Sequence, residues 1–219
     1  MRHYACPIAA AATGWGLAVM VLGTTTFSAP QSAGPRALGA KTPITYFIAV
    51  GAPQSGFRPS DRRLALWALE AWQRSAAGKL RFEPAIEQEA LVRLYWAEPN
   101  SGQYGEMRPL MVGGRRGAAV FVRPDVTSLD EAVADRAVVD ELLRDSIVYL
   151  TCLHELGHAL GLVHTSDFRD IMYSFGYGGD LATYFGRYRG QLHDSSDIAT
   201  VSGLSDGDVS RLRATYATQ

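Results

Sequence analysis

Three histidines and one glutamate are crowded into residues 154–164, where they can share a metal ion. His154 and His158 are four residues apart, so on a helix their side chains lie on one face, one turn from each other. Both imidazoles can then reach a single ion. Zinc accepts imidazole nitrogen at about 2.0–2.1 Å and prefers tetrahedral geometry. The spacing therefore predicts a zinc ion that takes two of its ligands from one helix.

His164 is the predicted third ligand, and Gly161 is the reason for that prediction. An uninterrupted helix would carry residue 164 to a different face, away from the ion. Glycine can adopt the left-handed conformation that ends a helix and turns the chain back. Because Gly161 lies between the second and third ligands, His164 can approach the same ion. Three protein ligands leave the fourth zinc position to water, as in catalytic sites.

Glu155 directly follows the first ligand and is the predicted catalytic residue. Its side chain points about 100° round the helix from that of His154, which places it beside the open zinc position. There a carboxylate can take a proton from a zinc-activated water and later give it to a departing amine. The predicted function is a zinc-dependent endopeptidase, with Glu155 as general base and then general acid.

The alternative from another functional class is a secreted binding module that contains zinc and has no proteolytic activity. A structural zinc site is closed by a fourth protein ligand. Cys152 is near in sequence, but it lies two residues before His154 and so faces away from the metal. We expect Cys152 to be a buried, small apolar residue. The presence of Glu155 favours the enzyme, because a structural site does not need it.

Composition and charge indicate an ordinary soluble globular protein. The chain has 219 residues, a formal net charge of -1 and 47% hydrophobic residues. This length is enough for one domain with a proper core. The near-neutral charge gives no electrostatic reason to expect binding to nucleic acid or to an anionic membrane surface. We expect a monomer whose partner is a protein or peptide substrate.

The N-terminal segment has the order of a secretory signal: a charge at Arg2, a mostly apolar stretch over residues 8–22, and then small residues. We predict a signal peptide over residues 1–29, with cleavage between 29 and 40, a linker over 30–42 and the catalytic domain over 43–219. The protein is therefore expected to be secreted and to have no stable membrane association after cleavage. The alternative is a protein anchored in the membrane through an uncleaved N-terminal segment.

Hydrophobic periodicity and turn residues predict the elements that must position the histidines. The helix that carries the ligands is predicted over residues 146–160, as a strongly apolar and buried segment. Ser205 is predicted to cap a last helix that runs through Tyr216, and a capping box of Ser128 and Glu131 predicts another helix start. Strands are predicted over residues 43–50, 91–96 and in two parts of 107–122, a further helix over 60–78, and a loop over 173–203.

The full pattern of residues 154–164 resembles that of the metzincin metalloproteases, and most closely the matrixin family. Members of this clan have a methionine turn beneath the metal, and Asp170-Ile171-Met172-Tyr173 looks like such a turn. Met172 lies eight residues after His164, which is the separation typical of matrixins. Tyr173 follows the methionine directly, also as in matrixins.

The resemblance implies an α/β (α+β) fold: a metzincin-like twisted mixed sheet, a backing helix, the zinc-binding active-site helix and a small C-terminal lobe. The active site would be a cleft between the lobes. An edge strand, expected at residues 118–122, would pair with an extended substrate. The segment after Met172 would shape the pocket for the residue that follows the scissile bond, with Tyr173 as a candidate wall. We expect bulky apolar residues at that substrate position.

The sequence also departs from the family pattern. Animal matrixins bind a second, structural zinc through further histidines, but only His193 remains outside the leader and the predicted triad. Such a site is therefore not expected, whereas Ca²⁺ stays open because Asp180, Asp194 and Asp197 lie in predicted loops. The cysteine latency switch of the pro-domain is not expected either, since the one upstream cysteine, Cys6, lies in the predicted signal peptide.

Overall fold

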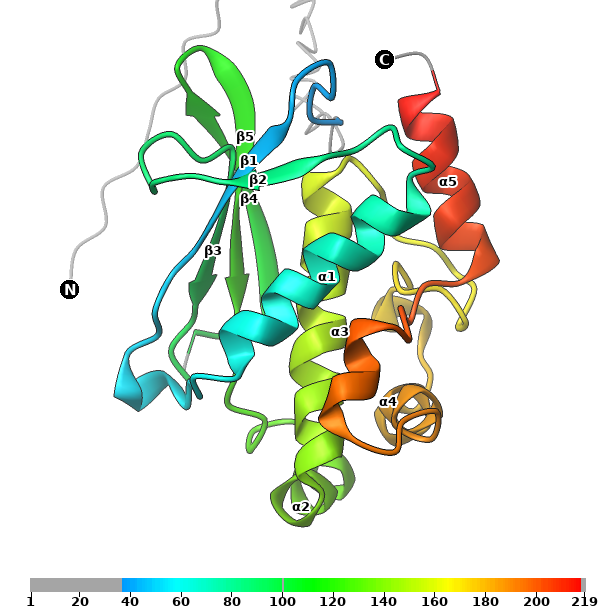
Figure 1. Cartoon of the computed structure of the whole chain (residues 1–219). Helices are drawn as coiled ribbons and strands as arrows, with labels where there is room; N and C mark the ends of the chain where they lie inside the picture. Colours follow the sequence, from blue (N-terminus) through cyan, green and yellow to red (C-terminus); the bar gives the residue numbers. More distant parts are fainter. Residues whose placement is uncertain (1–36, 100, 218–219) are drawn as a thin grey trace, which may run out of the picture. The chain divides into compact units, whose positions relative to one another are not determined.

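A five-stranded mixed sheet is the central element of the fold (Figure 1). The structure is a computed structural model that describes residues 37–99 and 101–217. Its parallel strands are β1 (Ile44–Ile48), β2 (Phe82–Pro84), β3 (Val92–Trp96) and β5 (Arg115–Val122), and β4 (Gly105–Val112) is antiparallel to β5. The spatial order is β2-β1-β3-β5-β4. The predicted α/β class with a mixed sheet is confirmed.

The open edge beside β5 is formed by β4, so the prediction that residues 118–122 form the edge strand is wrong. Those residues belong to β5, which lies between β3 and β4. Gly113 and Gly114 have φ angles of 53° and 77°, and the tight turn that they form joins β4 and β5 as a hairpin. Pro109 lies inside β4, and a proline is tolerated there because an edge strand has one side without partners.

Two long helices, α1 (Asp61–Ser75) and α3 (Glu141–Ala159), pack against each other and against the sheet (Figure 1). Leu64, Ala68 and Trp72 recur at helical spacing on the buried side of α1. The indole nitrogen of Trp72 donates a hydrogen bond of 2.9 Å to the carbonyl of Leu153 in α3. Helix α1 is thus the predicted backing helix, and it fixes the position of α3, which carries two of the predicted ligands.

Helix α2 (Glu131–Val139) begins with a different cap from the predicted one. The carboxylate of Asp130 accepts the Ala132 N–H at 3.1 Å, so the predicted capping box of Ser128 and Glu131 is wrong. The Ser128 hydroxyl lies instead 3.3 Å from the hydroxyl of Tyr104. Asp130 is the better cap because its carboxylate is charged and the positive end of the helix dipole is close by.

The other helix starts also follow their capping residues. Helix α5 (Asp206–Tyr216) begins after Ser205, whose side chain and that of Asp208 form a capping box, which confirms the predicted start. Helix α3 begins earlier than the predicted residue 146, because Asp140 caps it by accepting the Leu143 N–H at 3.0 Å.

The segment predicted as a loop over residues 173–203 contains helix α4 (Leu181–Arg189) and two short 3-10 helices, η2 (Phe175–Tyr177) and η3 (Ser195–Ala199). Asp180 caps α4 by accepting the Thr183 N–H at 2.5 Å. The buried residues of α4 are aromatic, namely Tyr184, Phe185 and Tyr188. The packing of these rings stabilises the helix despite the nearby glycines, which had led to the prediction of a loop.

The N-terminal predictions lie largely outside the described residues. They include the signal peptide over residues 1–29, Cys6 and most of the linker over residues 30–42. Within residues 37–99 and 101–217, no helix is both long enough and apolar enough to cross a membrane.

Candidate active site

The end of α3 turns the chain back along the helix. Gly161 adopts a φ of 95°, in the left-handed region, which confirms the predicted turn. Its N–H donates to the carbonyl of His158 at 3.0 Å, and the Leu162 N–H donates to that of Gly157 at 3.0 Å. These two bonds form a Schellman motif, which satisfies the last helical carbonyls and reverses the chain. His164 is thereby brought back to the other two histidines.

The three histidine side chains converge on one point. The Nε2 atom of His164 lies 3.2 Å from that of His154 and 3.1 Å from that of His158. The candidate ligand atoms of the triad all lie within 4.8 Å of one another. In a tetrahedral zinc site with bonds of about 2.0–2.1 Å, ligand atoms lie about 3.3 Å apart. The spacing of the nitrogen atoms therefore fits a zinc ion.

Backbone carbonyls fix the tautomers of two of these rings. Nδ1 of His154 lies 2.7 Å from the carbonyl oxygen of Ile171, and Nδ1 of His158 lies 2.9 Å from that of Leu162. A carbonyl oxygen only accepts, so each Nδ1 carries the hydrogen and each Nε2 of a neutral ring presents a lone pair. These two lone pairs point toward Nε2 of His164, at 3.2 and 3.1 Å, where the three nitrogen atoms can share a cation. The donor set therefore suits zinc, with the two carbonyls orienting the rings.

Burial favours the neutral form of these imidazoles, which is the form that binds metal. Loss of solvation lowers the pKa of His154 to about 4, and the nearby His158 ring adds to the effect. Burial also lowers the pKa of His158 and that of His164. The three rings are thus neutral near pH 7.

Glu155 lines the same cavity as His154 and His164, and it is only 7% exposed. Burial raises the pKa of its carboxyl to about 8, and the negative charge of Glu106 adds to this rise. The backbone of Gly105 in β4 lies directly against the carboxylate, since a Cβ atom there would be 2.5 Å from Oε1 of Glu155. Because residue 105 is a glycine, the backbone of β4 can pack in contact with the Glu155 carboxylate.

Met172 is fully buried and packs against α3. A Cβ atom on Gly157 would lie 2.4 Å from the Met172 sulfur, so this glycine allows the turn to approach the helix. Asp208 of α5 holds the turn by accepting the Ile171 N–H at 2.7 Å and the Met172 N–H at 3.4 Å. Because the carbonyl of Ile171 accepts from the ring of His154, Asp208 helps to orient a predicted ligand.

Asp170 ties the same turn to α5. Its carboxylate accepts from Nη2 of Arg211 at 2.6 Å, from the Ser205 hydroxyl at 2.5 Å and from the Thr165 hydroxyl at 2.8 Å. Hydrogen bonds to an ionised carboxylate are stronger than hydrogen bonds between neutral groups. Asp170 was recognised only as part of the turn motif, and no role was predicted for its side chain or for that of Asp208. The feature of the sequence that could have pointed to Asp208 is its place three residues after Ser205, in the capping box that begins α5.

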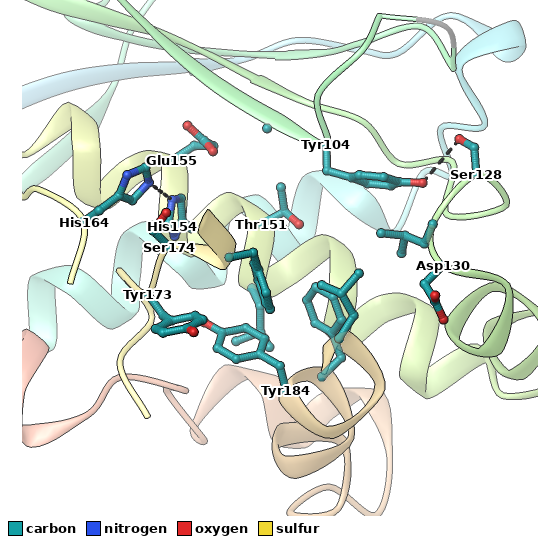
Figure 2. Close-up of a pocket in the computed structure, with 16 residues that line it drawn as sticks. Tyr104, Ser128, Asp130, Thr151, His154, Glu155, His164, Tyr173, Ser174 and Tyr184 are labelled. Atoms are coloured by element: carbon teal, nitrogen blue, oxygen red, sulfur yellow. Dashed lines mark hydrogen bonds between the residues drawn. The ribbon is translucent and has the colours of Figure 1, made fainter. Parts of the chain in front are cut away.

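A cavity of about 410 Å³ extends from the triad along α3 (Figure 2). His154, Glu155 and His164 line one end, and Tyr104 and Ser128 line the other. The remaining lining residues come mainly from α3 and from the segment that leads into α4, and they include Leu150, Thr151, Tyr173, Phe175, Leu181, Tyr184 and Phe185. An apolar pocket that ends at a few converging polar groups is typical of a ligand-binding site.

One known protein family matches most of this domain. A model of the matrixin family matches residues 39–183, which is more than half of the chain. The chain belongs to the matrixin family. Two solved structures of myroilysin are similar to this matrixin. One has 16% sequence identity and a TM-score of 0.41, and the match covers 84% of this chain and 86% of that chain. The other has 13% identity and a TM-score of 0.39, with 84% of this chain and 83% of that chain covered.

A matrixin is a zinc metallopeptidase, so the family implies a catalytic zinc, and the histidine triad fits it. Among the described residues of this matrixin, the triad is the one group of three or more potential ligands close enough to share an ion. The aspartates considered for Ca²⁺ cap helices instead, Asp180 at α4 and Asp194 with Asp197 at η3. Calcium binding stays a prediction, because among the described residues these carboxylates do not form a group of three or more that could share an ion.

In this matrixin, Tyr173 was predicted to lie in the substrate pocket, whereas Tyr104 and Gly105 were not. Tyr173 lines the cavity, and its hydroxyl donates to the carbonyl of Gly178 at 2.8 Å. Tyr104 and Gly105 line it from the start of β4. They were missed because the edge was assigned to the other strand of the hairpin. Cys152 is fully buried, as predicted.

Proposed function

We propose that this matrixin is a secreted zinc endopeptidase that cleaves proteins or peptides at internal bonds. In this proposal His154, His158 and His164 hold one catalytic zinc, and Glu155 transfers the proton. The observation that carries the proposal is the convergence of three histidine Nε2 atoms, with those of His154 and His158 at 3.2 and 3.1 Å from that of His164, beside a buried carboxylate in the same cavity.

Bound zinc supplies a Lewis acid that polarises the scissile carbonyl and activates a water molecule. Glu155 lies at the same end of the cavity as the triad, where its carboxylate accepts the proton that the attacking water releases. The protonated carboxyl then donates that proton to the amine nitrogen of the departing peptide. Burial raises the pKa of this carboxyl in the metal-free site, and a zinc ion beside it would favour the ionised form that accepts the proton.

The open edge of β4 offers main-chain hydrogen bonds to an extended peptide. The Arg123 N–H donates to the Tyr104 carbonyl at 2.8 Å, so Tyr104 directs its backbone groups toward β5. Because this direction alternates along an antiparallel ladder, Gly105, Met107 and Pro109 direct theirs to the open edge. Proline has no N–H, so complete pairing beside the catalytic centre covers Gly105 and Met107 and is interrupted at Pro109. This favours β-augmentation next to the catalytic centre.

Pairing with β4 also sets the direction of the substrate. β4 runs from Gly105, which lies against Glu155, to Val112. An antiparallel peptide therefore places its N-terminal residues along β4 and its C-terminal residues beyond Gly105, toward Tyr104. Antiparallel pairing is the more stable arrangement per residue. The side chain that follows the scissile bond is then the one that enters the cavity of about 410 Å³.

Peptides blocked at both ends test this function against the alternative of a binding module. The zinc-loaded protein is expected to cleave an acetylated and amidated peptide internally, because an open edge strand binds a chain without requiring a free terminus. A chelator should abolish cleavage. Binding of the peptide without cleavage would support the binding module, and cleavage of unblocked peptides only would indicate an exopeptidase. Either result would contradict the proposal.

Secretion is proposed from the leader sequence alone. Recovery outside the cell of protein that begins between residues 29 and 40 would support it. Full-length protein retained in the membrane fraction would support the alternative of an uncleaved anchor.

A further inference from the structure

We infer that Tyr104 is a specificity-determining residue of this matrixin, and that its ring is the surface against which an aromatic substrate side chain stacks directly after the scissile bond. The inference rests on the proposed function, because it assigns a substrate class to the same site. Two observations support it: the contacts that hold the Tyr104 ring in place, and the aromatic and apolar side chains that line the cavity.

The ring of Tyr104 is fixed from two directions. Its hydroxyl lies 3.3 Å from that of Ser128, and Figure 2 shows the ring extending toward Ser128 along one side of the cavity. The Arg123 guanidinium lies over the ring, 3.6 Å from its centroid. Arg123 is buried, donates to the carbonyl of Pro99 at 2.8 Å and does not line the cavity. The cation therefore covers one face of the ring, and the other face is left for a substrate.

Three further hydroxyl groups in the cavity already donate hydrogen bonds. Those of Thr151, Tyr173 and Tyr184 donate to main-chain carbonyls at 2.8, 2.8 and 3.0 Å. These residues therefore offer methyl and ring surfaces to a substrate rather than free donors. Tyr184 and Phe175 lie with their ring centroids 5.1 Å apart, and both line the cavity. The pocket thus has Tyr104 as one aromatic wall and this cluster as another, as Figure 2 shows for Tyr104 and Tyr184.

The size and charge of the cavity favour an aromatic side chain over the alternatives. A cavity of about 410 Å³ leaves a short aliphatic side chain partly unpacked. Aromatic side chains bury roughly 150–250 Å² each and gain further from contact with other rings. A basic side chain would meet only Asp130 beyond the catalytic end, and that carboxylate already caps α2. Aromatic residues therefore match the walls best.

The test compares end-blocked peptides that differ only in the residue after the scissile bond, which is phenylalanine, leucine, arginine or alanine. With the zinc-loaded full chain, kcat/KM is expected to be highest for phenylalanine. Tyr104→Leu keeps an apolar wall but removes the aromatic face, so the ratio of phenylalanine to leucine should fall about tenfold. Tyr104→Phe keeps the ring and should retain the preference. Zinc content and melting temperature show whether each variant is folded.

Tyr177→Ala is the matched control, because Tyr177 is 67% exposed and does not line the cavity. It should leave all ratios unchanged. An aromatic preference that survives in Tyr104→Leu would overturn the inference, as would a wild-type preference for leucine or arginine. In both cases the peptides are still cleaved, so the proposed function stands.

Absence of any cleavage by the wild-type protein would instead refute the proposed function. The inference is then tested by calorimetry with phenylalanyl-glycine amide and alanyl-glycine amide. A preference of about tenfold for the first, lost in Tyr104→Leu, is the expected result. Equal affinities of the wild-type protein for both would overturn the inference.

Discussion

Glu155→Gln is expected to lower kcat by about 10²- to 10⁴-fold while the protein keeps its zinc, because the amide occupies the same space but cannot accept the proton. The three proposed ligands are histidines, so metal content should be unaffected. Folding should also be preserved, since Glu155 is buried against Gly105 and a neutral group costs less to bury than a carboxylate. Zinc analysis and peptide hydrolysis on the same sample measure both effects.

Glu141→Gln is a matched control for this variant. Glu141 lies at the start of the same helix, and its side chain is 85% exposed in a long ion pair with Arg58. Its replacement should leave kcat within a few fold of the wild-type value. If Glu155→Gln hydrolysed peptides at the wild-type rate, Glu155 would not be the proton carrier. If it lost zinc as well, Glu155 would have to be considered a ligand.

His158→Ala is expected to lower zinc affinity by more than about 100-fold, and hydrolysis should be lost with the metal. Loss of an outer partner of a metal ligand already costs about 10- to 100-fold, and His158 is proposed to bind the ion itself. Its Nε2 atom lies 3.1 Å from that of His164, so the truncated side chain leaves two histidines where three converged. Competition with a fluorescent zinc chelator measures the affinity.

His193→Ala supplies the comparison, because His193 is a histidine outside the triad that does not line the cavity. It should bind zinc and hydrolyse peptides like the wild-type protein. Zinc loss in His193→Ala, or wild-type affinity in His158→Ala, would show that the ion is held elsewhere.

The local geometry of the site was accessible from the sequence because it depends on residues close together in the chain. The four-residue spacing of His154 and His158 needs only a helix, and Gly161 encodes the turn that returns His164 to it. The helix cap at Ser205 is equally local, and the structure has it at the predicted place.

The parts that depend on contacts between distant segments could not be predicted. Which strand of the β4–β5 hairpin lies outside depends on how β5 pairs with β3, and the residues of the hairpin do not encode that choice. Helix α4 was hidden because glycines flank it, while its aromatic residues form a helix by packing on the rest of the domain. Tyr104 gave no signal, since its role depends on Arg123 and Ser128.

The central claim is that one zinc ion, held by the histidine triad, is required for peptide hydrolysis. The most direct measurement removes all metal with a chelator and then follows the hydrolysis of an end-blocked peptide as zinc is added back. If this claim is right, the metal-free protein hydrolyses no peptide, and the rate rises linearly with added zinc to a plateau at about one equivalent per chain. Hydrolysis by the metal-free protein, or tight binding of one equivalent without hydrolysis, would contradict it.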